Sequence, residues 1–194
     1  FEDAHIRAMN VVREMDITFS ITDPDEFGYI ELELIVADLV KRTKGGPAIL
    51  VIDYAQIAAE GFSGTGDTRS DVKAFAKTLR KIAKLNKIVV WAISSISREK
   101  WAGLASGMKE GARGAAPLYA AFKTPAPVFM GVGAESSGIE YWADAVLVSL
   151  PATRNYVLGG RMVPVAVAKQ RSESDGWLNF RFDGLRFHEM AVPL

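Results

Sequence analysis

Two short, uninterrupted apolar segments on either side of an amphipathic stretch constrain the fold of this chain more than any other feature. Residues 48–52 read Ala-Ile-Leu-Val-Ile, and residues 88–93 read Ile-Val-Val-Trp-Ala-Ile. Continuous runs of this length are typical of strands that are covered on both faces in a parallel sheet, because a half-exposed strand alternates apolar and polar residues. Between them, residues 70–85 carry apolar residues at helical spacing and lysines on the opposite side. The order strand, helix, strand is typical of an α/β fold.

The remaining segments extend this pattern. The predicted elements are a strand at 17–21, a helix at 28–44 ended by Gly45-Gly46-Pro47, and strands at 145–150, 163–168, 177–182 and from Phe187. No internal repeat occurs. We therefore expect a single α/β domain with a mostly parallel central sheet.

Composition excludes several classes of protein. The 194 residues are 49% hydrophobic and 24% charged and contain no cysteine, which is typical of a globular chain without a disulfide framework, thiolate metal site or thiol nucleophile. No apolar run approaches the roughly 20 residues that cross a bilayer, and charged residues near Phe1 interrupt any signal-peptide core. We therefore expect a cytoplasmic protein without a membrane partner. His5 and His188 are too far apart in sequence to predict a metal site.

The formal net charge of zero hides a segregation of charge. The first 38 residues contain ten acidic and two basic residues, whereas residues 69–113 contain eleven basic and three acidic ones. A field of this kind can bind a polyanion or pair neighbouring subunits. The alternative is a lysine-rich helix face that is simply solvated, and charge alone leaves both interpretations open.

The side chains that follow the predicted strands are the candidates for chemistry, because ligands of open α/β sheets bind at the carboxyl ends of the strands. Asp53 follows the first apolar run, in the arrangement by which a Walker-B carboxylate orients a Mg²⁺-bound water against nucleotide phosphates. Ser94 and Ser95 follow the second run. Lys169 and Arg171 end a later strand and place two cations on one side of an extended chain. The alternatives are a carboxylate that caps a turn and two exposed cations without a ligand.

Four segments in a fixed order resemble the motifs of a known family. They read Ile-Leu-Val-Ile-Asp-Tyr-Ala-Gln-Ile at 49–57, Ala-Ile-Ser-Ser-Ile-Ser-Arg at 92–98, Glu-Ser-Ser-Gly-Ile-Glu at 135–140 followed by Ala143-Asp144, and Ala-Lys-Gln-Arg at 168–171. The first resembles the second helicase motif of DnaB-type replicative helicases. The others resemble the third motif of that family, the segment before its next core strand, and its fourth motif. Order and spacing are kept over residues 45–185.

The resemblance implies a RecA-like core in a hexameric ring, with ATP and Mg²⁺ bound at each subunit boundary. Asp53 would then be the Walker-B carboxylate that holds Mg²⁺ through water. Arg171 would be the arginine finger that reaches the γ-phosphate held by the neighbouring subunit, with Lys169 as its partner. Ser95 and Gln170 would contact the nucleotide. A head-to-tail interface of this kind closes into a ring.

The resemblance also implies a site for single-stranded DNA, which family members bind on loops in the central channel. The corresponding region here is a Gly-, Ala- and Pro-rich segment at 99–134, which we expect to be a mobile DNA-binding loop. Backbone contacts need charge more than base-specific groups. The basic residues assigned to DNA are Arg98, Lys100, Lys109, Arg113 and Lys123. The alternative is a surface loop with incidental charges.

Three departures from the family pattern limit the resemblance. No G-x-x-x-x-G-K-[ST] sequence occurs, so the backbone cradle for phosphates at a helix start is missing. We therefore expect residues 1–194 to be one incomplete RecA-like domain, part of a longer protein and inactive on its own. Ser95 stands where the family usually has a glutamine, and Ala134 stands where it usually has a basic residue.

The function that the resemblance implies is that of an ATP-dependent DNA helicase motor. It would translocate 5′ to 3′ on single-stranded DNA, with a primase or a loader as a further partner. One alternative is a RecA-like module that binds DNA or a partner without turnover. Another is a RecA- or KaiC-like ATPase in recombination or regulation, which an unwinding assay on forked DNA would separate from the first.

Overall fold

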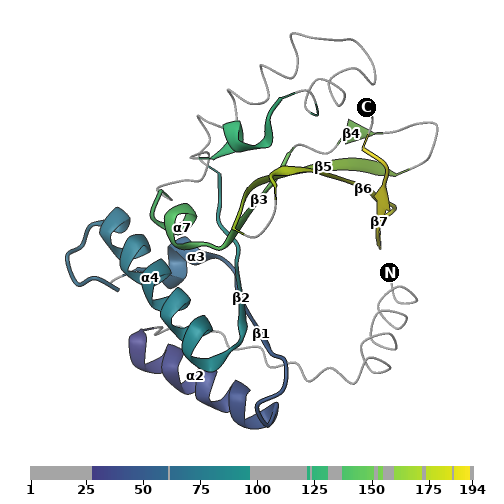
Figure 1. Cartoon of the computed structure of the whole chain (residues 1–194). Coiled ribbons are helices and arrows are strands. Elements are labelled where there is room, and N and C mark those ends of the chain that lie inside the picture. Colours follow the sequence, from purple (N-terminus) through teal and green to yellow (C-terminus); the bar gives the residue numbers. More distant parts are fainter. Residues whose placement is uncertain are drawn as a thin grey trace.

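The computed structural model of the chain (Figure 1) describes residues 28–60, 62–96, 122, 124–130, 137–150, 153–154, 160–171, 174–184 and 186–192. Its first half contains α2 (Tyr29–Arg42), β1 (Ile49–Ile52), α3 (Ala55–Ala58), α4 (Thr68–Asn86) and β2 (Val89–Ala92). Its second half contains the 3₁₀ helix η1 (Ala126–Phe129), α7 (Ser137–Trp142), β3 (Ala145–Ser149), β4 (Thr153–Arg154), β5 (Arg161–Gln170), β6 (Gly176–Phe182) and β7 (Phe187–Met190). The strand predicted at 17–21 lies outside the described residues.

Helices α2 and α4 form where the sequence predicts helices. Both are amphipathic, and signals in the sequence mark their ends. Helix α4 buries a stripe of apolar side chains that includes Val72, Phe75 and Leu79. The N–H of Gly45 donates to the carbonyl oxygen of Val40 at 3.3 Å while Gly45 adopts a left-handed φ of +77°, which completes the end of α2 at the predicted glycines. Within the described ranges, no helix has the length and apolar character needed to cross a membrane.

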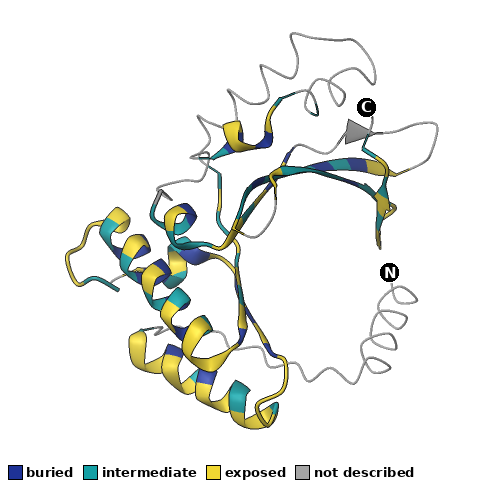
Figure 2. Ribbon diagram, viewed as in Figure 1, coloured by how far each residue is buried: buried dark blue, intermediate teal, exposed yellow. Residues whose placement is uncertain are grey.

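Strands β1 and β2 form a parallel pair, with Ile49 opposite Val89 and Ile52 opposite Ala92. Leu50 and Ile52 are buried in the core that this pair forms with α2 and α4. The two helices lie on the same side of the pair (Figures 1 and 2). The side chains of the other face are 56–60% exposed, namely Ile49, Val51, Val89 and Trp91. The prediction that both faces of these strands are covered is therefore wrong for the described residues, because helices pack on one face only.

The other five strands form one antiparallel sheet. Its order is β3-β5-β6-β7, and β4 pairs with the beginning of β5. The prediction of a mostly parallel central sheet is thus not met by the described strands, of which only β1 and β2 are parallel. The physical reason is the length of the connections: residues 171–175 join β5 to β6, and residues 183–186 join β6 to β7. A parallel pair needs a crossover of about a dozen residues or more.

Helix α7, which leads into β3, packs against α4 and so joins the two parts of the fold. The two backbones approach closely at Gly138, where an added Cβ atom would lie 3.0 Å from the Cα atom of Lys73. A second core lies where η1 packs against β5, with Ala126, Phe129 and Ala166 among its buried residues. The close contact of α7 with α4 at Gly138 determines where the segment after α7 begins.

The amino end of α4 is capped by Asp67, which gives a prediction about acid stability. Its Oδ2 accepts hydrogen bonds from the hydroxyl of Ser70 at 2.6 Å and from the N–H of Ser70 at 3.0 Å. Both bonds favour the carboxylate and lower the pKa of Asp67 below its ordinary value. The carboxylate therefore stabilises the folded state above about pH 4, and this contribution is lost as the pH falls through the lowered pKa.

We expect Asp67→Asn to lower the melting temperature of the protein at neutral pH and to lower it less in strong acid, where the wild-type carboxyl is protonated as well. Thermal unfolding followed by circular dichroism across this pH range measures the difference between the two proteins. A difference that stays the same from neutral pH into strong acid would contradict the role of the ionised cap.

Candidate functional site

The carboxyl ends of β1 and β2 bring the first group of predicted site residues together. Asp53 follows β1 and is exposed. Ser94 and Ser95 follow β2 at the same edge, because the two strands are parallel. The N–H of Ala55 donates to the carbonyl oxygen of Ile93 at 2.7 Å, which extends the pairing of the two chains beyond the strands.

Gln56 of α3 connects these two strand ends through its side-chain amide. Its Nε2 donates to the hydroxyl of Ser94 at 2.9 Å, and its Oε1 accepts the backbone N–H of Ser95 at 3.3 Å. Sequence reasoning assigned no role to Gln56, although it stands three residues after Asp53 within a motif. Its side chain fixes the Ser95 segment relative to the segment that carries Asp53.

Lys169 and Arg171 stand at the carboxyl end of β5 and contact the segment between α7 and β3. The ammonium group of Lys169 donates to the carbonyl oxygens of Glu140 at 2.7 Å and Tyr141 at 3.1 Å. Arg171 forms an ion pair with Asp144, in which Nε lies 2.8 Å from Oδ1. One short segment, residues 140–144, therefore holds both cations.

A further cation, Arg80 of α4, joins this cluster. Its Nη2 lies 3.8 Å from the same Asp144 oxygen, and its guanidinium carbon lies 5.8 Å from the centre of the Trp142 ring. Burial lowers the pKa of Lys169, and the charges of Arg171 and Arg80 lower it further, while Asp144 opposes the shift. Burial is the largest cause of this lowered pKa, and the neighbouring positive charges add to it.

The predicted site residues thus lie at the edges of two different sheets. Asp53 and Ser95 belong to the β1–β2 pair. Lys169, Gln170 and Arg171 belong to the end of β5 in the antiparallel sheet, where Gln170 is half-buried. The residues assigned to DNA all lie outside the described part of the chain: Arg98, Lys100, Lys109, Arg113 and Lys123.

Sequence reasoning missed Arg80 and Asp144 as members of the site. Arg80 resembles the other basic residues on the outer side of α4, so its spacing carries no specific signal. Asp144 precedes the predicted strand at 145–150 and belongs to the third of the four segments that resemble family motifs. This membership was the signal that could have identified it. Both depend on a contact between α4 and the end of β5 that only the fold creates.

Part of the segment predicted to bind DNA is described and packs on the antiparallel sheet. The indole N–H of Trp177 in β6 donates to the carbonyl oxygen of Thr124 at 3.0 Å. The rings of Trp177 and Phe129 meet edge to face with their centroids 5.3 Å apart, and Phe129 is buried. Residues 124–130 are therefore attached to the strand that follows the turn after Arg171.

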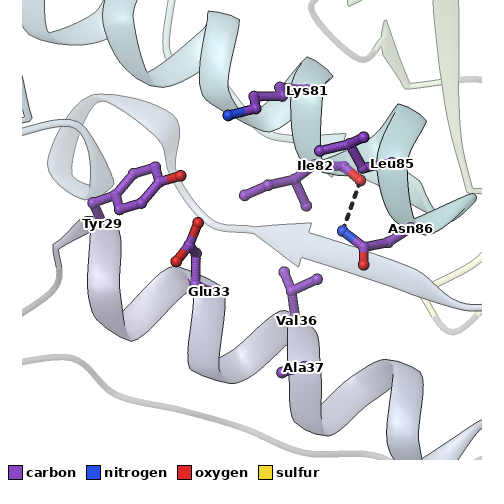
Figure 3. A pocket seen from close by; sticks show the side chains of 8 residues that line it. All are labelled: Tyr29, Glu33, Val36, Ala37, Lys81, Ile82, Leu85 and Asn86. Atoms are coloured by element: carbon purple, nitrogen blue, oxygen red, sulfur yellow. Dashed lines mark hydrogen bonds between the residues drawn. The ribbon is translucent and has the colours of Figure 1, made fainter.

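A pocket of about 320 Å³ lies between α2 and α4 (Figure 3). Tyr29 and Glu33 extend into it from α2, opposite Lys81 and Leu85 of α4. A hydrogen bond to Glu33 raises the pKa of Tyr29. None of the predicted site residues lines this pocket, so it is separate from the strand ends described above.

Comparison with solved structures finds a similar fold in known proteins. No protein-family model and no curated protein matches the chain. A DnaB-like replicative helicase, solved in a study of its interactions with primase, is similar with a TM-score of 0.64 and 19% identity, over 90% of this chain and 38% of the helicase. The ATPase domain of a second protein is similar with a TM-score of 0.63 and 19% identity, over 98% of this chain and 61% of that one.

The fold is therefore of the α/β class and is similar to those of the DnaB-like replicative helicase and of this ATPase domain. Within this class, the solved DnaB-like helicase has the same fold over nine-tenths of the chain, as the resemblance in sequence predicts. The chain spans less than two thirds of the length of each of the two proteins.

Proposed function

We propose that this chain is the motor domain of an ATP-dependent DNA helicase, which forms a hexameric ring and translocates 5′ to 3′ on single-stranded DNA. The observation that carries the proposal is the presence of charged strand ends in a helicase ATPase fold. One end presents Asp53 beside the bridge between Gln56 and Ser95, and the other presents Lys169 and Arg171. Ligands of open α/β sheets bind at the carboxyl ends of parallel strands, which is where Asp53 stands.

Asp53 fits a Mg²⁺ ion held through water. Its carboxylate is exposed at the end of an apolar strand, and Mg²⁺ prefers oxygen ligands while keeping several of its waters. In the described ranges, no group of three or more His, Asp or Glu side chains gathers, so phosphate and water oxygens would supply the other ligands. The bound ion would offset the negative charge of the ATP phosphates. Because the 194 residues lack a G-x-x-x-x-G-K-[ST] cradle, we place the phosphate-binding loop outside them.

Arg171 is the proposed arginine finger, and Lys169 is its partner. The Arg171 side chain is 44% exposed, so a phosphate held by a neighbouring subunit can reach its guanidinium. A guanidinium supplied in this way stabilises the charge that develops on the transferred phosphoryl group and is worth roughly 10³ to 10⁵ in rate. Head-to-tail contacts of this type close into a ring. Ser95 and Gln170 are the further nucleotide contacts that we propose.

Single-stranded DNA is the proposed ligand of the basic segment at 99–134 and of Arg98. The contact between Trp177 and Thr124 supports this assignment, because it attaches the end of that segment to the sheet that carries Arg171. A primase or a loader is the proposed protein partner. The support is the similar fold of the DnaB-like helicase that was solved in a study of its interactions with primase.

A second candidate function is a RecA-like module that binds DNA or a partner without turning over ATP. The observation that favours it is the missing G-x-x-x-x-G-K-[ST] sequence, since nothing in the 194 residues replaces that cradle by pattern. In such a module, Asp53 would only follow the end of strand β1, without a role in ATP turnover. Arg171 would stay paired with Asp144.

The test is ATP hydrolysis and unwinding of forked DNA by the full-length protein. We expect the wild type to do both and Asp53→Asn to lose about 100-fold or more of its ATP turnover, because the carboxylate holds the ion that offsets the phosphate charge. Asp38→Asn is the matched control. It removes an exposed carboxylate of α2 that pairs with Arg42 at 2.6 Å, and it should leave turnover unchanged.

Each alternative gives a different outcome in this experiment. DNA binding without ATP turnover in the wild type would favour the non-catalytic module. ATP turnover without unwinding would instead indicate a RecA- or KaiC-like ATPase. Equal turnover of Asp53→Asn and wild type would contradict the proposed role of Asp53.

A further inference from the structure

The Asp144 carboxylate lies between two guanidinium groups that come from different elements, Arg171 at the end of β5 and Arg80 of α4. We propose that Asp144 is a positioning residue for Arg171. It orients the Arg171 guanidinium at the edge of the sheet, and Arg80 keeps Asp144 paired when Arg171 turns towards a phosphate. The inference rests on the proposed function, since it assigns a task within the arginine-finger site.

Arg171 is attached to Asp144 at two points. Its Nε lies 2.8 Å from Oδ1, and its backbone N–H donates to the carbonyl oxygen of Asp144 at 3.1 Å. A hydrogen bond between charged groups is roughly twice as strong as one between neutral groups. The backbone bond holds the base of the side chain and the ion pair holds its Nε, so the two contacts together restrict the rotamers of Arg171.

The ion pair between Arg171 and Asp144 is exposed to solvent. The side chains of Arg171 and Asp144 are 44% and 71% exposed. Water and salt screen an ion pair with this exposure, so a phosphate group can compete with Asp144 for the guanidinium. Asp144 can therefore orient Arg171 before the phosphate arrives and release it afterwards.

Arg80 gives Asp144 a second partner. Its Nη2 lies 3.8 Å from the same oxygen that contacts Arg171, and its guanidinium lies over the ring of Trp142 with 5.8 Å between the carbon and the ring centre. Both contacts of Arg80 are with residues of the segment 140–144. When Arg171 leaves, the Asp144 carboxylate still has the positive charge of Arg80 nearby.

The segment that contains Asp144 also holds the neighbouring cation. The carbonyl oxygens of Glu140 and Tyr141 bind the Lys169 ammonium group, so the contact with Lys169 depends on the backbone. The contact with Arg171 depends on a side chain. Substitution of Asp144 therefore separates the two, because it removes the carboxylate at Arg171 and retains the carbonyl oxygens at Lys169.

The test is a double-mutant cycle on ATP turnover by the full-length protein. We expect Asp144→Ala to lower kcat by about 10- to 100-fold and to change KM by less than about threefold, because a misplaced catalytic group affects the transition state more than ground-state binding. In the Arg171→Ala background the same substitution should have no further effect, since Asp144 acts through Arg171. Asp144→Asn retains an oxygen acceptor, so its kcat should lie between those of Asp144→Ala and the wild type.

Asp183→Asn is the matched control. Asp183 binds a backbone N–H, that of Arg186 at 2.9 Å, and a side chain, that of His188 at 2.7 Å, at the opposite end of the sheet. It should leave kcat unchanged. The melting temperatures of all variants separate a loss of the fold from a loss of catalytic rate. If Asp144→Ala does not fold, Asp144→Asn takes its place in the double-mutant cycle.

Two results would overturn the positioning role while the proposed function stands. One is a normal kcat of a folded Asp144 variant together with an inactive Arg171→Ala. The other is a loss of rate in Asp144→Ala that adds fully to that of Arg171→Ala. A wild-type protein without ATP turnover would overturn the proposed function, and the positioning role with it.

Discussion

Replacing Arg171 by alanine in the full-length protein should reduce ATP turnover by about 1,000-fold or more, while nucleotide affinity changes by less than about threefold. As an arginine finger, the guanidinium would act on charge that develops at the phosphoryl group in the transition state, so the bound nucleotide would lose little when it is removed. The proposed task is compatible with the position of Arg171, which is exposed at a strand end and forms an ion pair of 2.8 Å with Asp144. Steady-state hydrolysis and nucleotide titration measure the two quantities.

Arg161→Ala is the matched control for this experiment, because Arg161 is an exposed arginine at the other end of the same strand. It should hydrolyse ATP at the wild-type rate. Mixing Arg171→Ala subunits with Asp53→Asn subunits should restore part of the turnover, since some subunit boundaries then combine an intact Asp53 with an intact Arg171. Undiminished turnover of Arg171→Ala would contradict the arginine-finger assignment.

Replacing Phe75 by alanine is expected to lower the free energy of unfolding by about 3–5 kcal/mol. The Phe75 side chain is fully buried, and its ring meets that of Phe62 edge to face with the centroids 5.0 Å apart. The core that it fills is shared by α2, β1 and α4, so the cavity would weaken the contact of both helices with the β1–β2 pair. Urea unfolding followed by circular dichroism measures the loss.

Leu85→Ala provides the comparison on the same helix. Leu85 is 69% exposed, and its truncation should change the free energy of unfolding by no more than about 0.5 kcal/mol. If both variants lost the same amount, the apolar stripe of α4 would not be the main contact between the helix and the sheet.

The helices could be predicted because their signals are local. The prediction of 70–85 falls within α4 and that of 28–44 encloses α2, since apolar spacing and end signals lie within the segments themselves. The strand at 163–168 was found for the same reason, and β5 extends it at both ends. Which strands pair depends on segments far apart in the chain. The short connection at 171–175 was the local sign that β5 and β6 are antiparallel, and the prediction of a mostly parallel sheet did not use it.

The position of the candidate site residues at strand ends could also be predicted, because the apolar runs before them mark the strands. Their roles stay predictions. The residues that contact these strand ends could not be predicted. Gln56 contacts Ser94 across 38 residues of sequence, and Arg80 reaches Asp144 only because α7 packs against α4. Such contacts follow from tertiary structure, so they leave no periodic or compositional trace in the sequence.

The close approach at Gly138 limits which substitutions the chain can tolerate near its cations. Any side chain at this position would have to push α7 away from Lys73 by a few tenths of an ångström. Residues 140–144 continue directly from that point, so the carbonyl oxygens at Lys169 and the carboxylate at Arg171 would shift with it. Gly138 has no side chain, yet its substitution would change the spacing of Lys169 and Arg171 relative to residues 140–144. The effect on the candidate site would therefore come from a change of geometry alone.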